Sequence, residues 1–500
     1  MAKIKPIALK NVYRNSLIAI VVTAIFTRFY ELSILPPGIT LGETRVGTAA
    51  FNLLHHGLLP SFGSISGGSP LLVFFESIAM AIFGTTPWAL RIIPALLGVL
   101  AVYCLYLWVS RWFSIRTALF ASFLLAVTPW AVTISRNIEP ASLGVILISS
   151  LYLFATKLYH SKSNKDAIIL GVVCLLAGLA GPVGWASLLV LGSSVFVISI
   201  VNMKNFKPAT VYAWLCVGIV ITILTLLYAS LVHISQKIFI LSAIGGMFTN
   251  FFLSLGAYNL HGDLDYYHNL AGLPLLNVFV GIMFIAGLLL TATKFSSNVN
   301  KVFLAGAAVA LIPAIISGVN APNAAHLILT LPFVLIMAAI GIEYMLDTWC
   351  NTFPINSAAR AVGQGAIGIL LLLTAYQGYL QYFVAWKDST ETYFVYNQTD
   401  IGIAKWVGNL PKNTSAVIVV SKDDQTVLNY LLISKTNYTY LTSANAATLL
   451  KTRPLNLVLS PSNQDTLIPL LKTNASGSTI KPHTSLFDGE YIYYTYEIIK

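Results

Sequence analysis

The chain has 500 residues, of which 57% are hydrophobic and only 9% charged, and its mean hydropathy is +0.78. Soluble domains carry about a quarter charged residues, so this composition excludes a soluble globule and predicts a membrane protein. The net charge is +11, and the lysines and arginines are scattered singly through polar stretches. This pattern favours anchoring of cytoplasmic loops over nucleic-acid binding. The four cysteines show no CxxC or Cys/His spacing, which disfavours a disulfide framework or a thiolate metal site.

Apolar segments of membrane-spanning length recur along most of the chain. Because lipid-exposed backbone must satisfy its own hydrogen bonds, most of these segments are predicted to be helices. They lie at residues 17–33, 70–84, 89–109, 117–133, 141–157, 167–181, 185–203, 210–232, 275–292, 301–317, 325–346 and 363–385. The segment at 70–84 is short and contains Glu76, which is typical of a helix in the membrane interface.

Basic residues predict the orientation of these helices. Four of them precede residue 15, whereas the loop after the first helix has only Arg45, so the N-terminus is predicted to be cytoplasmic. Arg111 and Arg116 then mark a cytoplasmic loop, which requires that only one of the two segments between residues 70 and 109 spans the membrane, and we assign this span to 89–109. Continuing by parity gives about eleven transmembrane helices, with outer loops at 34–88 and 233–274.

The composition changes near residue 386. Residues 1–385 are predicted to form a polytopic α-helical membrane domain in the cell membrane, and residues 386–500, rich in Asn, Thr and Ser, a small extracytoplasmic α/β domain. Its β-type runs and helix-like stretches lie at 415–420, 455–459 and 491–499, and at 400–410 and 444–451.

The first outer loop contains an acid, Glu43, close to Arg45 and to the membrane surface. A carboxylate there can orient or deprotonate an acceptor while the tail of a lipid-phosphate donor stays in the bilayer. Glu43 could equally cap an interfacial helix over about 43–57, near the positive end of its dipole. The two interpretations stay open from this loop alone.

A second acid, Glu139, lies in TPWAVTISRNIEP, on the same predicted outer face as Glu43. Arg136, three residues earlier, could neutralise a donor phosphate, or it could pair with Glu139 or a lipid headgroup. The latter use is the commoner one for an arginine at a helix end.

The large outer loop gathers His261, Asp263, Asp265 and His268 within eight positions. Carboxylates and imidazoles suit divalent ions, so this cluster could hold a divalent metal ion as cofactor. The spacing is not a sharp metal motif, and a polar interfacial loop is the commoner explanation. His326 lies in a smaller polar group on the same predicted face, where a lone histidine more often bonds a helix start than catalyses.

The order of several motifs resembles the GT-C family of membrane glycosyltransferases, which includes protein O-mannosyltransferases, the aminoarabinose transferase of lipid A and bacterial relatives. No single motif is specific, but their order and spacing together are. They are PPGITLGE at 36–43, SPLLVFF at 69–75, FGTTPWALRIIPALLG at 83–98, TPWAVTISRNIEP at 128–140, HNLAGLPLL at 268–276 and APNAAH at 321–326.

The resemblance implies an inverting transfer in which an outer-loop acid activates the acceptor and a basic group binds the leaving phosphate. By position, Glu43 and Glu139 would be the catalytic acids. The contacts to donor phosphate and substrate would be Arg45, Arg136, His268, Asn269 and His326. Gly42 stands where the family has the aspartate of its acidic pair, so Glu43 would act from one position later, or Glu139 would take over.

The leading hypothesis is therefore a glycosyltransferase that moves a sugar from a polyprenyl-phosphate carrier to an extracytoplasmic lipid, glycan or protein. A catalytically inactive scaffold with this fold is the first alternative, favoured by Gly42. A transporter is the second, but the inverted repeats and mid-membrane charges that it needs are not evident. Nucleotide-binding and serine-hydrolase chemistry are disfavoured because their motifs are missing from the sequence.

Overall fold

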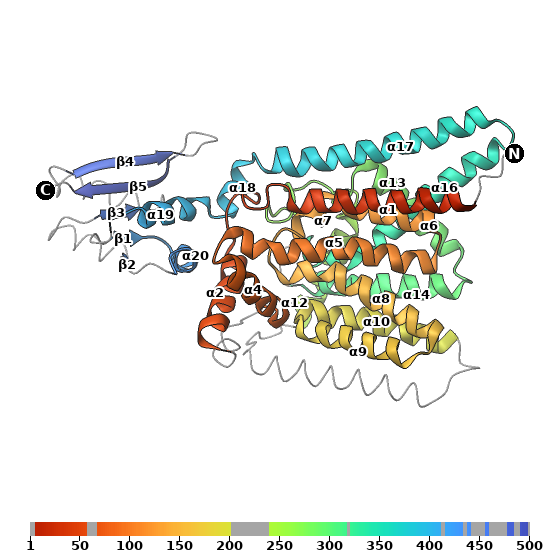
Figure 1. The fold of residues 1–500 in the computed structure, drawn as a ribbon, viewed down its shortest axis with the longest axis horizontal. Coiled ribbons are helices and arrows are strands. Elements are labelled where there is room, and N and C mark those ends of the chain that lie inside the picture. The colour runs from red at the N-terminus through yellow and green to blue at the C-terminus, as the bar shows by residue number, and fades with distance from the viewer. Residues whose placement is uncertain are drawn as a thin grey trace.

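The chain folds into a long helical part with a small sheet at one end (Figure 1). The computed structural model describes residues 6–57, 68–201, 240–317, 321–411, 416–433, 438–441, 456–459, 478–484 and 491–498. The start of α1 and the sheet lie at opposite ends of the molecule, which we call the far end and the sheet end (Figure 1).

The helical part is built from α-helices that are mostly parallel to its long axis (Figure 1). In its first half they are α1 (Pro6–Phe29), α2 (Leu41–His56), α4 (Pro70–Phe83), α5 (Pro87–Trp112), α6 (Ile115–Val127), α7 (Pro129–Ile134), the 3₁₀ turn η1 (Pro140–Leu143), α8 (Gly144–Ser161), α9 (Asn164–Leu179) and α10 (Pro182–Val201). In its second half they are α12 (Ile240–Gly256), α13 (Val278–Thr293), α14 (Asn298–Ala310), α15 (Ile312–Ile316), the 3₁₀ turn η3 (Ile328–Thr330), α16 (Leu331–Thr352), α17 (Ser357–Tyr379), the π-helical η4 (Leu380–Trp386) and α18 (Thr390–Val395).

Seven helices in the described residues are long and apolar enough to cross a membrane. They are Asn11–Phe29, Pro87–Trp112, Pro140–Ser161, Pro182–Val201, Asn298–Ile316, Ile328–Thr352 and Ser357–Trp386. Shorter apolar helices are α4, α6 and α13. The span expected at 210–232 lies outside the described residues. The protein is therefore a helical membrane protein.

Local sequence signals explain where these helices begin. The Ser69 and Thr86 side chains accept hydrogen bonds from the first turns of α4 and α5, and a proline follows each of them. Such a cap with proline at the first helical position is a strong start signal. Pro129, at the first position of α7, divides the segment expected at 117–133 into α6 and α7, so that segment is not the single helix that its hydropathy suggested.

Glycines let α13 and α16 pack closely. A Cβ on Gly287 would lie 1.7 Å from the Met337 carbonyl oxygen, and one on Gly341 would lie 2.2 Å from that of Met283. Small residues at such contacts are common between membrane helices, because they bring the backbones together.

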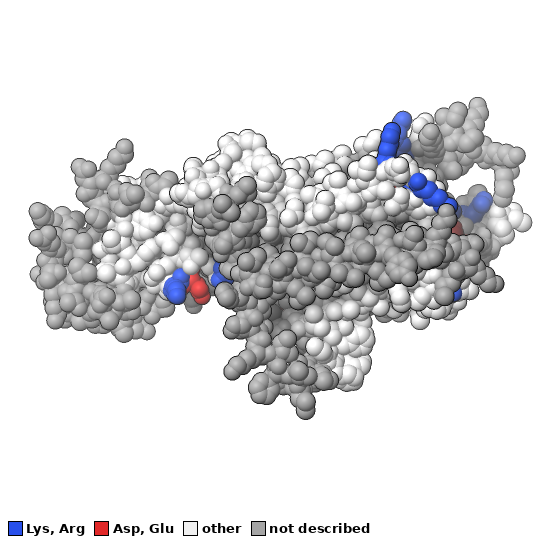
Figure 2. Space-filling model, turned by 90° about the horizontal axis from the view of Figure 1, so that it is seen from below, with Lys and Arg blue, Asp and Glu red and all other residues white. Residues whose placement is uncertain are grey.

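Charged side chains lie toward the two ends of the helical part. At the far end, Arg116 of α6 contacts Asp347 of α16 at 2.8 Å and Glu343 at 3.7 Å. The Ser114 hydroxyl also donates to Glu343, at 2.6 Å. On the face drawn in Figure 2, the coloured charges lie toward both ends, and the described surface between them is uncharged.

The C-terminal part, after α18, begins with α19 (Gln398–Gly408) and contains a five-stranded sheet. Its elements are β1 (Ala416–Val419), α20 (Lys422–Leu431), β2 (Tyr438–Tyr440), β3 (Asn456–Leu459), β4 (Ser478–Thr484) and β5 (Tyr491–Ile498). The strand order is β2-β1-β3-β5-β4, with β1 parallel to β2 and β3, and β5 antiparallel to β3 and β4. The helix-like stretch at 444–451 lies outside the described residues.

Candidate functional site

Glu43 caps α2 and forms a buried ion pair. Its backbone N–H donates to the Thr40 hydroxyl at 3.0 Å, and its carboxylate accepts the Thr40 N–H at 2.8 Å. This reciprocal capping box starts the helix. The same carboxylate accepts a hydrogen bond from Arg91 Nε of α5 at 3.1 Å, and both side chains are 1% exposed. The capping interpretation of Glu43 is thus confirmed.

Arg91 fixes the shape of the first loop. Besides Glu43, its guanidinium donates to the Pro36 carbonyl at 2.8 Å and to the Gly38 carbonyl. Sequence analysis did not single out this arginine, although it lies in the motif FGTTPWALRIIPALLG. Because Arg91 and Thr40 occupy both carboxylate oxygens, Glu43 is held rigidly and away from solvent.

Arg136 is buried and bonds to backbone rather than to an acid. Its guanidinium donates to the carbonyls of Thr27, Tyr30 and Leu35 at 2.8 to 3.0 Å. The charge also lies 5.3 Å from the centre of the Tyr382 ring, a cation–π contact. Arg136 is 0% exposed, so in this structure it ties the end of α1 to the chain after α7. The alternative pairing with Glu139 is not formed.

Glu139 instead meets a histidine from the large loop. Its two carboxylate oxygens lie 3.0 and 3.1 Å from His268 Nε2. On the other side of the ring, Asp263 lies 3.8 Å from His268 Nδ1, which is close for charges but too long for a hydrogen bond. The imidazole is therefore flanked by two carboxylates from separate loops.

The electrostatics of this cluster favour a charged histidine. Burial alone would lower the pKa of His268, but the Glu139 and Asp263 carboxylates outweigh it and raise the pKa to about 10. Glu139 is 24% exposed, against 1% for Glu43. Of the two acids predicted from the sequence, only Glu139 can therefore reach a bound molecule without a rearrangement.

His326 stands beside this cluster. Its backbone N–H donates to the side-chain oxygen of Asn323 at 3.1 Å, and its Nδ1 is buried without a partner in the described residues. Burial and the neighbouring positive His268 lower the pKa of His326. The site thus combines a charged histidine with a histidine kept neutral.

The predicted metal ligands serve other purposes. Asp263 accepts the backbone N–H groups of Ala324 at 2.7 Å and of Asp265 at 2.9 Å, and Asp265 accepts that of Tyr267 at 3.0 Å. His261 is exposed. Within the described residues, no three His, Cys, Asp or Glu side chains form a group that could hold a metal ion.

The remaining predicted contacts divide between structural and accessible positions. The Asn269 side chain donates to the Leu273 carbonyl at 2.6 Å and accepts from Gln381 at 2.9 Å, so it fixes the loop against η4. Arg45 is exposed on α2. Tyr396, which follows α18, joins the regions of both acids: its carbonyl accepts the Ile39 N–H at 2.7 Å, and its hydroxyl contacts Asn137 at 2.6 Å.

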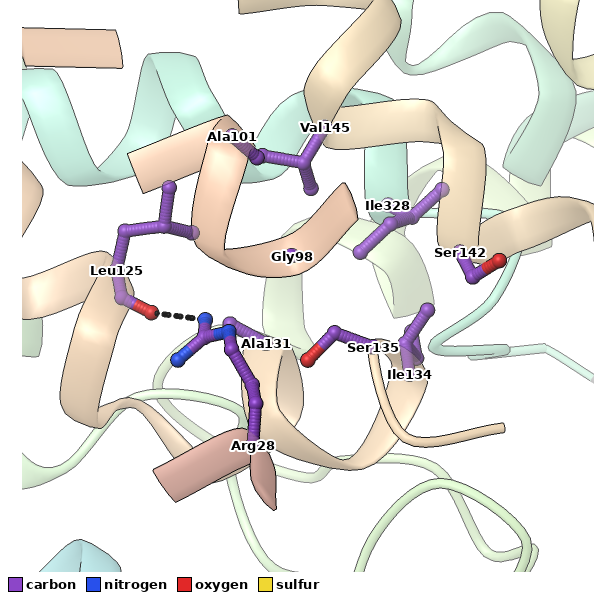
Figure 3. Close-up of a pocket in the computed structure, with 10 residues that line it drawn as sticks. All are labelled: Arg28, Gly98, Ala101, Leu125, Ala131, Ile134, Ser135, Ser142, Val145 and Ile328. Carbon is purple, nitrogen blue, oxygen red and sulfur yellow. Dashed lines mark hydrogen bonds between the residues drawn. The ribbon is translucent and has the colours of Figure 1, made fainter. Parts of the chain in front are cut away.

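A small cavity lies next to this region, beside Arg28 of α1 (Figure 3). Arg28 donates to the carbonyls of Leu125 at 2.9 Å and Ala126 at 3.0 Å, and the Ser135 hydroxyl lies near its guanidinium (Figure 3). The cavity holds about 10 Å³, which is room for about one water molecule and too little for a sugar or a phosphate.

Comparisons with known proteins agree with this architecture. A family model described as dolichyl-phosphate-mannose-protein mannosyltransferase matches residues 68–228. The "Putative mannosyltransferase YycA" of Bacillus subtilis (strain 168) is 32% identical over 111 residues. That match covers 22% of this chain and 16% of the relative, so it spans less than a fifth of the relative's length.

Solved structures match nearly the whole chain. The crystal structure of ArnT from Cupriavidus metallidurans in the apo state gives a TM-score of 0.58 at 15% identity, over 96% of this chain and 97% of ArnT. ArnT bound to undecaprenyl phosphate gives 0.55 at 13% identity, over 98% of each chain. The Archaeoglobus fulgidus oligosaccharyltransferase in complex with Zn and sulfate gives 0.53 at 13% identity, over 95% of this chain and 73% of that one.

The chain has the GT-C fold of membrane glycosyltransferases. At these identities the likeness establishes the fold and leaves the reaction to be argued from the site. Within this GT-C protein, the structure brings together Glu139, His268, Asp263 and His326 from three separate loops. Glu43 and Arg136 are built into the framework around them.

Proposed function

We propose that the protein transfers a sugar from a polyprenyl-phosphate-linked donor to an extracytoplasmic acceptor. The observation that carries this proposal is the Glu139–His268 pair, which is accessible on the Glu139 side and flanked by Asp263 and His326. The fold supports it, because the structure of ArnT bound to undecaprenyl phosphate matches nearly the whole of this chain. The family model for a dolichyl-phosphate-mannose-dependent transferase supports it as well.

Each residue of the cluster has a role in this reaction. Glu139 takes the proton of an acceptor hydroxyl, whose oxygen then attacks the anomeric carbon from the side opposite the phosphate. The bond between the anomeric carbon and the phosphate oxygen breaks, and the polyprenyl phosphate leaves with the electron pair. Once Glu139 is protonated, the His268 imidazolium loses part of its counter-charge, and the leaving phosphate restores it.

His326 and Arg45 would complete the phosphate contacts. His326 offers a neutral imidazole beside His268, with an Nδ1 that has no partner in the described part of the chain, and Arg45 is an exposed cation on α2. A divalent metal ion would be a further contact to the phosphate, and removal by chelation tests it directly. Loss of transfer with EDTA and recovery with Mg²⁺ or Mn²⁺ would support a metal, whereas unchanged transfer would reject it.

The proposed reaction is at the outer face of the membrane. We propose about eleven crossings, a cytoplasmic N-terminus and an extracytoplasmic C-terminal domain that helps to hold the acceptor. The position of Arg116 at the far end, opposite to Glu139 at the sheet end, agrees with this orientation. The assignment rests on the positive-inside rule and is tested by labelling of single cysteines from either side of sealed vesicles.

An inactive scaffold is the second candidate, and specific observations favour it. Gly42 carries no side chain where GT-C relatives were expected to have an aspartate. The Glu43 carboxylate is already bonded to Arg91 and to the backbone N–H of the capping box. In this case the Glu139–His268 pair would serve only to hold two loops together.

Transfer of radiolabelled sugar from a panel of polyprenyl-phosphate sugars separates the two candidates. The assay uses the full chain in lipid nanodiscs, with Glu139→Gln as the test variant and His261→Gln as the control from the exposed part of the same region. We expect the native chain and the control to consume one donor, and Glu139→Gln to lose at least about a hundredfold in rate. If no donor is consumed while an active relative works in the same nanodiscs, the scaffold is the correct assignment.

A further inference from the structure

Helix α20 of the C-terminal part is buried on two faces. Leu428 and Leu432, one turn apart, pack in the core of the C-terminal part with Ile418 of β1. Val427 and Tyr430 point elsewhere: they are 1% and 3% exposed and belong to the core of the helical part. The helix therefore lies between the two parts and contacts α2.

Tyr430 lies on a glycine in α2. A Cβ built on Gly47 would come within 2.6 and 2.9 Å of two ring atoms of Tyr430, and within 3.1 Å of the Leu90 side chain. Any larger residue would push the ring away. Gly47 follows Glu43 by one helical turn, and Leu90 precedes Arg91, so the ring contacts the same stretches of α2 and α5 that carry the Glu43–Arg91 ion pair.

Two polar groups that the proposed mechanism does not use are buried here. Glu76 of α4 is 0% exposed, and neither of its carboxyl oxygens has a hydrogen-bond partner among the described residues. The Tyr430 hydroxyl is likewise buried and unpartnered there. Burial is the largest cause that raises the pKa of Tyr430, and the Glu76 and Glu43 carboxylates raise it as well, so both acids lie within electrostatic reach of the ring.

The chemistry of these groups makes them suitable partners. Burial and the nearby Glu43 raise the pKa of Glu76 to about 9, so Glu76 is a neutral carboxylic acid at pH 7. A carboxylic acid and a phenol can each donate and accept, and a buried polar group without a partner is costly. Two such groups within electrostatic reach of each other can satisfy one another through a rotamer change in Glu76.

We propose that Tyr430 and Glu76 form a docking contact that holds the C-terminal part on α2 and positions the Glu43–Arg91 ion pair. Tyr430 supplies the ring that fits against Gly47, and its hydroxyl bonds to the Glu76 carboxyl beneath. The C-terminal part then packs against the first-loop region and fixes its position, in addition to helping to bind the acceptor. Only the consequence for transfer rests on the proposed function, because docking itself is measured independently.

Hydrogen exchange of the full chain in nanodiscs tests the contact. Tyr430→Phe keeps the ring and removes the hydroxyl, Glu76→Leu removes the acid, and Glu76→Gln keeps an uncharged hydrogen-bonding group. Tyr440→Phe is the matched control, because its hydroxyl is also buried and has no partner among the residues that the structure describes, but lies on β2 in the C-terminal part. The amides of α2 and α20 report docking.

We expect Tyr430→Phe and Glu76→Leu each to speed exchange in α2 and α20 by about tenfold. The double variant should be no faster than either single one, Glu76→Gln should stay within about threefold of native, and the control should leave α2 unchanged. In an active preparation, Tyr430→Phe should lower kcat more than it changes KM. If Tyr430→Phe leaves exchange unchanged or slows it, or if the two effects multiply, the hydroxyl has no partner in Glu76 and the proposal is wrong.

Discussion

The charged state of His268 makes the stability of the protein depend on pH in a defined window. Its pKa of about 10 in the folded protein, against 6.5 for an ordinary histidine, corresponds to about 5 kcal/mol of folding free energy. This contribution is complete below pH 6.5 and is lost as the pH rises toward 10, because the unfolded chain has by then already given up the proton. At pH 8 about 3 kcal/mol remains.

Replacing Glu139 by Gln removes the carboxylate that raises this pKa most, while burial continues to lower it. We expect the variant to lose about 3 kcal/mol at pH 6 and little at pH 10. The free energy of unfolding is measured by denaturant titration in detergent micelles between pH 6 and 10. His261→Gln, which changes an exposed histidine of the same region, serves as the control. A difference between native and Glu139→Gln that does not change with pH would refute a charged His268.

Four further substitutions test the framework. Arg91→Met should cost about 3 to 5 kcal/mol in unfolding free energy, because it leaves Glu43 buried and unpaired. Gly38→Ala should lower the free energy of unfolding by about 3 kcal/mol, because its Cβ would lie 1.8 Å from the Tyr396 carbonyl oxygen. Gly42 is exposed, so Gly42→Asp should change the free energy of unfolding by no more than about 0.5 kcal/mol. In the transfer assay Gly42→Asp should raise the rate, and an unchanged rate would argue against a catalytic acid at this position. Gly287→Ala should lower the melting temperature, since its Cβ would meet the backbone of α16.

Features governed by local sequence were predictable. The capping box of Glu43 follows from a threonine three residues before a glutamate, and the helical segments follow from hydropathy. The side-by-side placement of Glu139 and His268 agrees with their assignment to one face of the membrane. Membrane topology predicts only that Glu139 and His268 lie on the same face of the membrane. It does not predict the 3.0 Å contact between the Glu139 carboxylate and His268 Nε2.

Pairings over long distances were not predictable in the same way. Arg91 meets Glu43 across 48 positions of sequence, and no periodic pattern marks either residue as the other's partner. Arg136 was expected to meet a phosphate, a headgroup or Glu139, yet it bonds to carbonyl groups. Every residue carries a carbonyl, so a backbone acceptor leaves no signature in a sequence.

The carbonyl contacts of Arg28 bear on how the protein is made. Arg28 lies in the last turn of a membrane helix, but the carbonyls that accept its hydrogen bonds, those of Leu125 and Ala126, are translated about a hundred residues later. Until then, α1 emerges from the ribosome with a cation that only water, lipid phosphate or the insertion machinery can solvate. Arg136, which follows α7, also contacts this end of α1, because its guanidinium donates to the Thr27 carbonyl. The contacts that bury the Arg28 guanidinium can therefore form only after α6 and α7 have been synthesised.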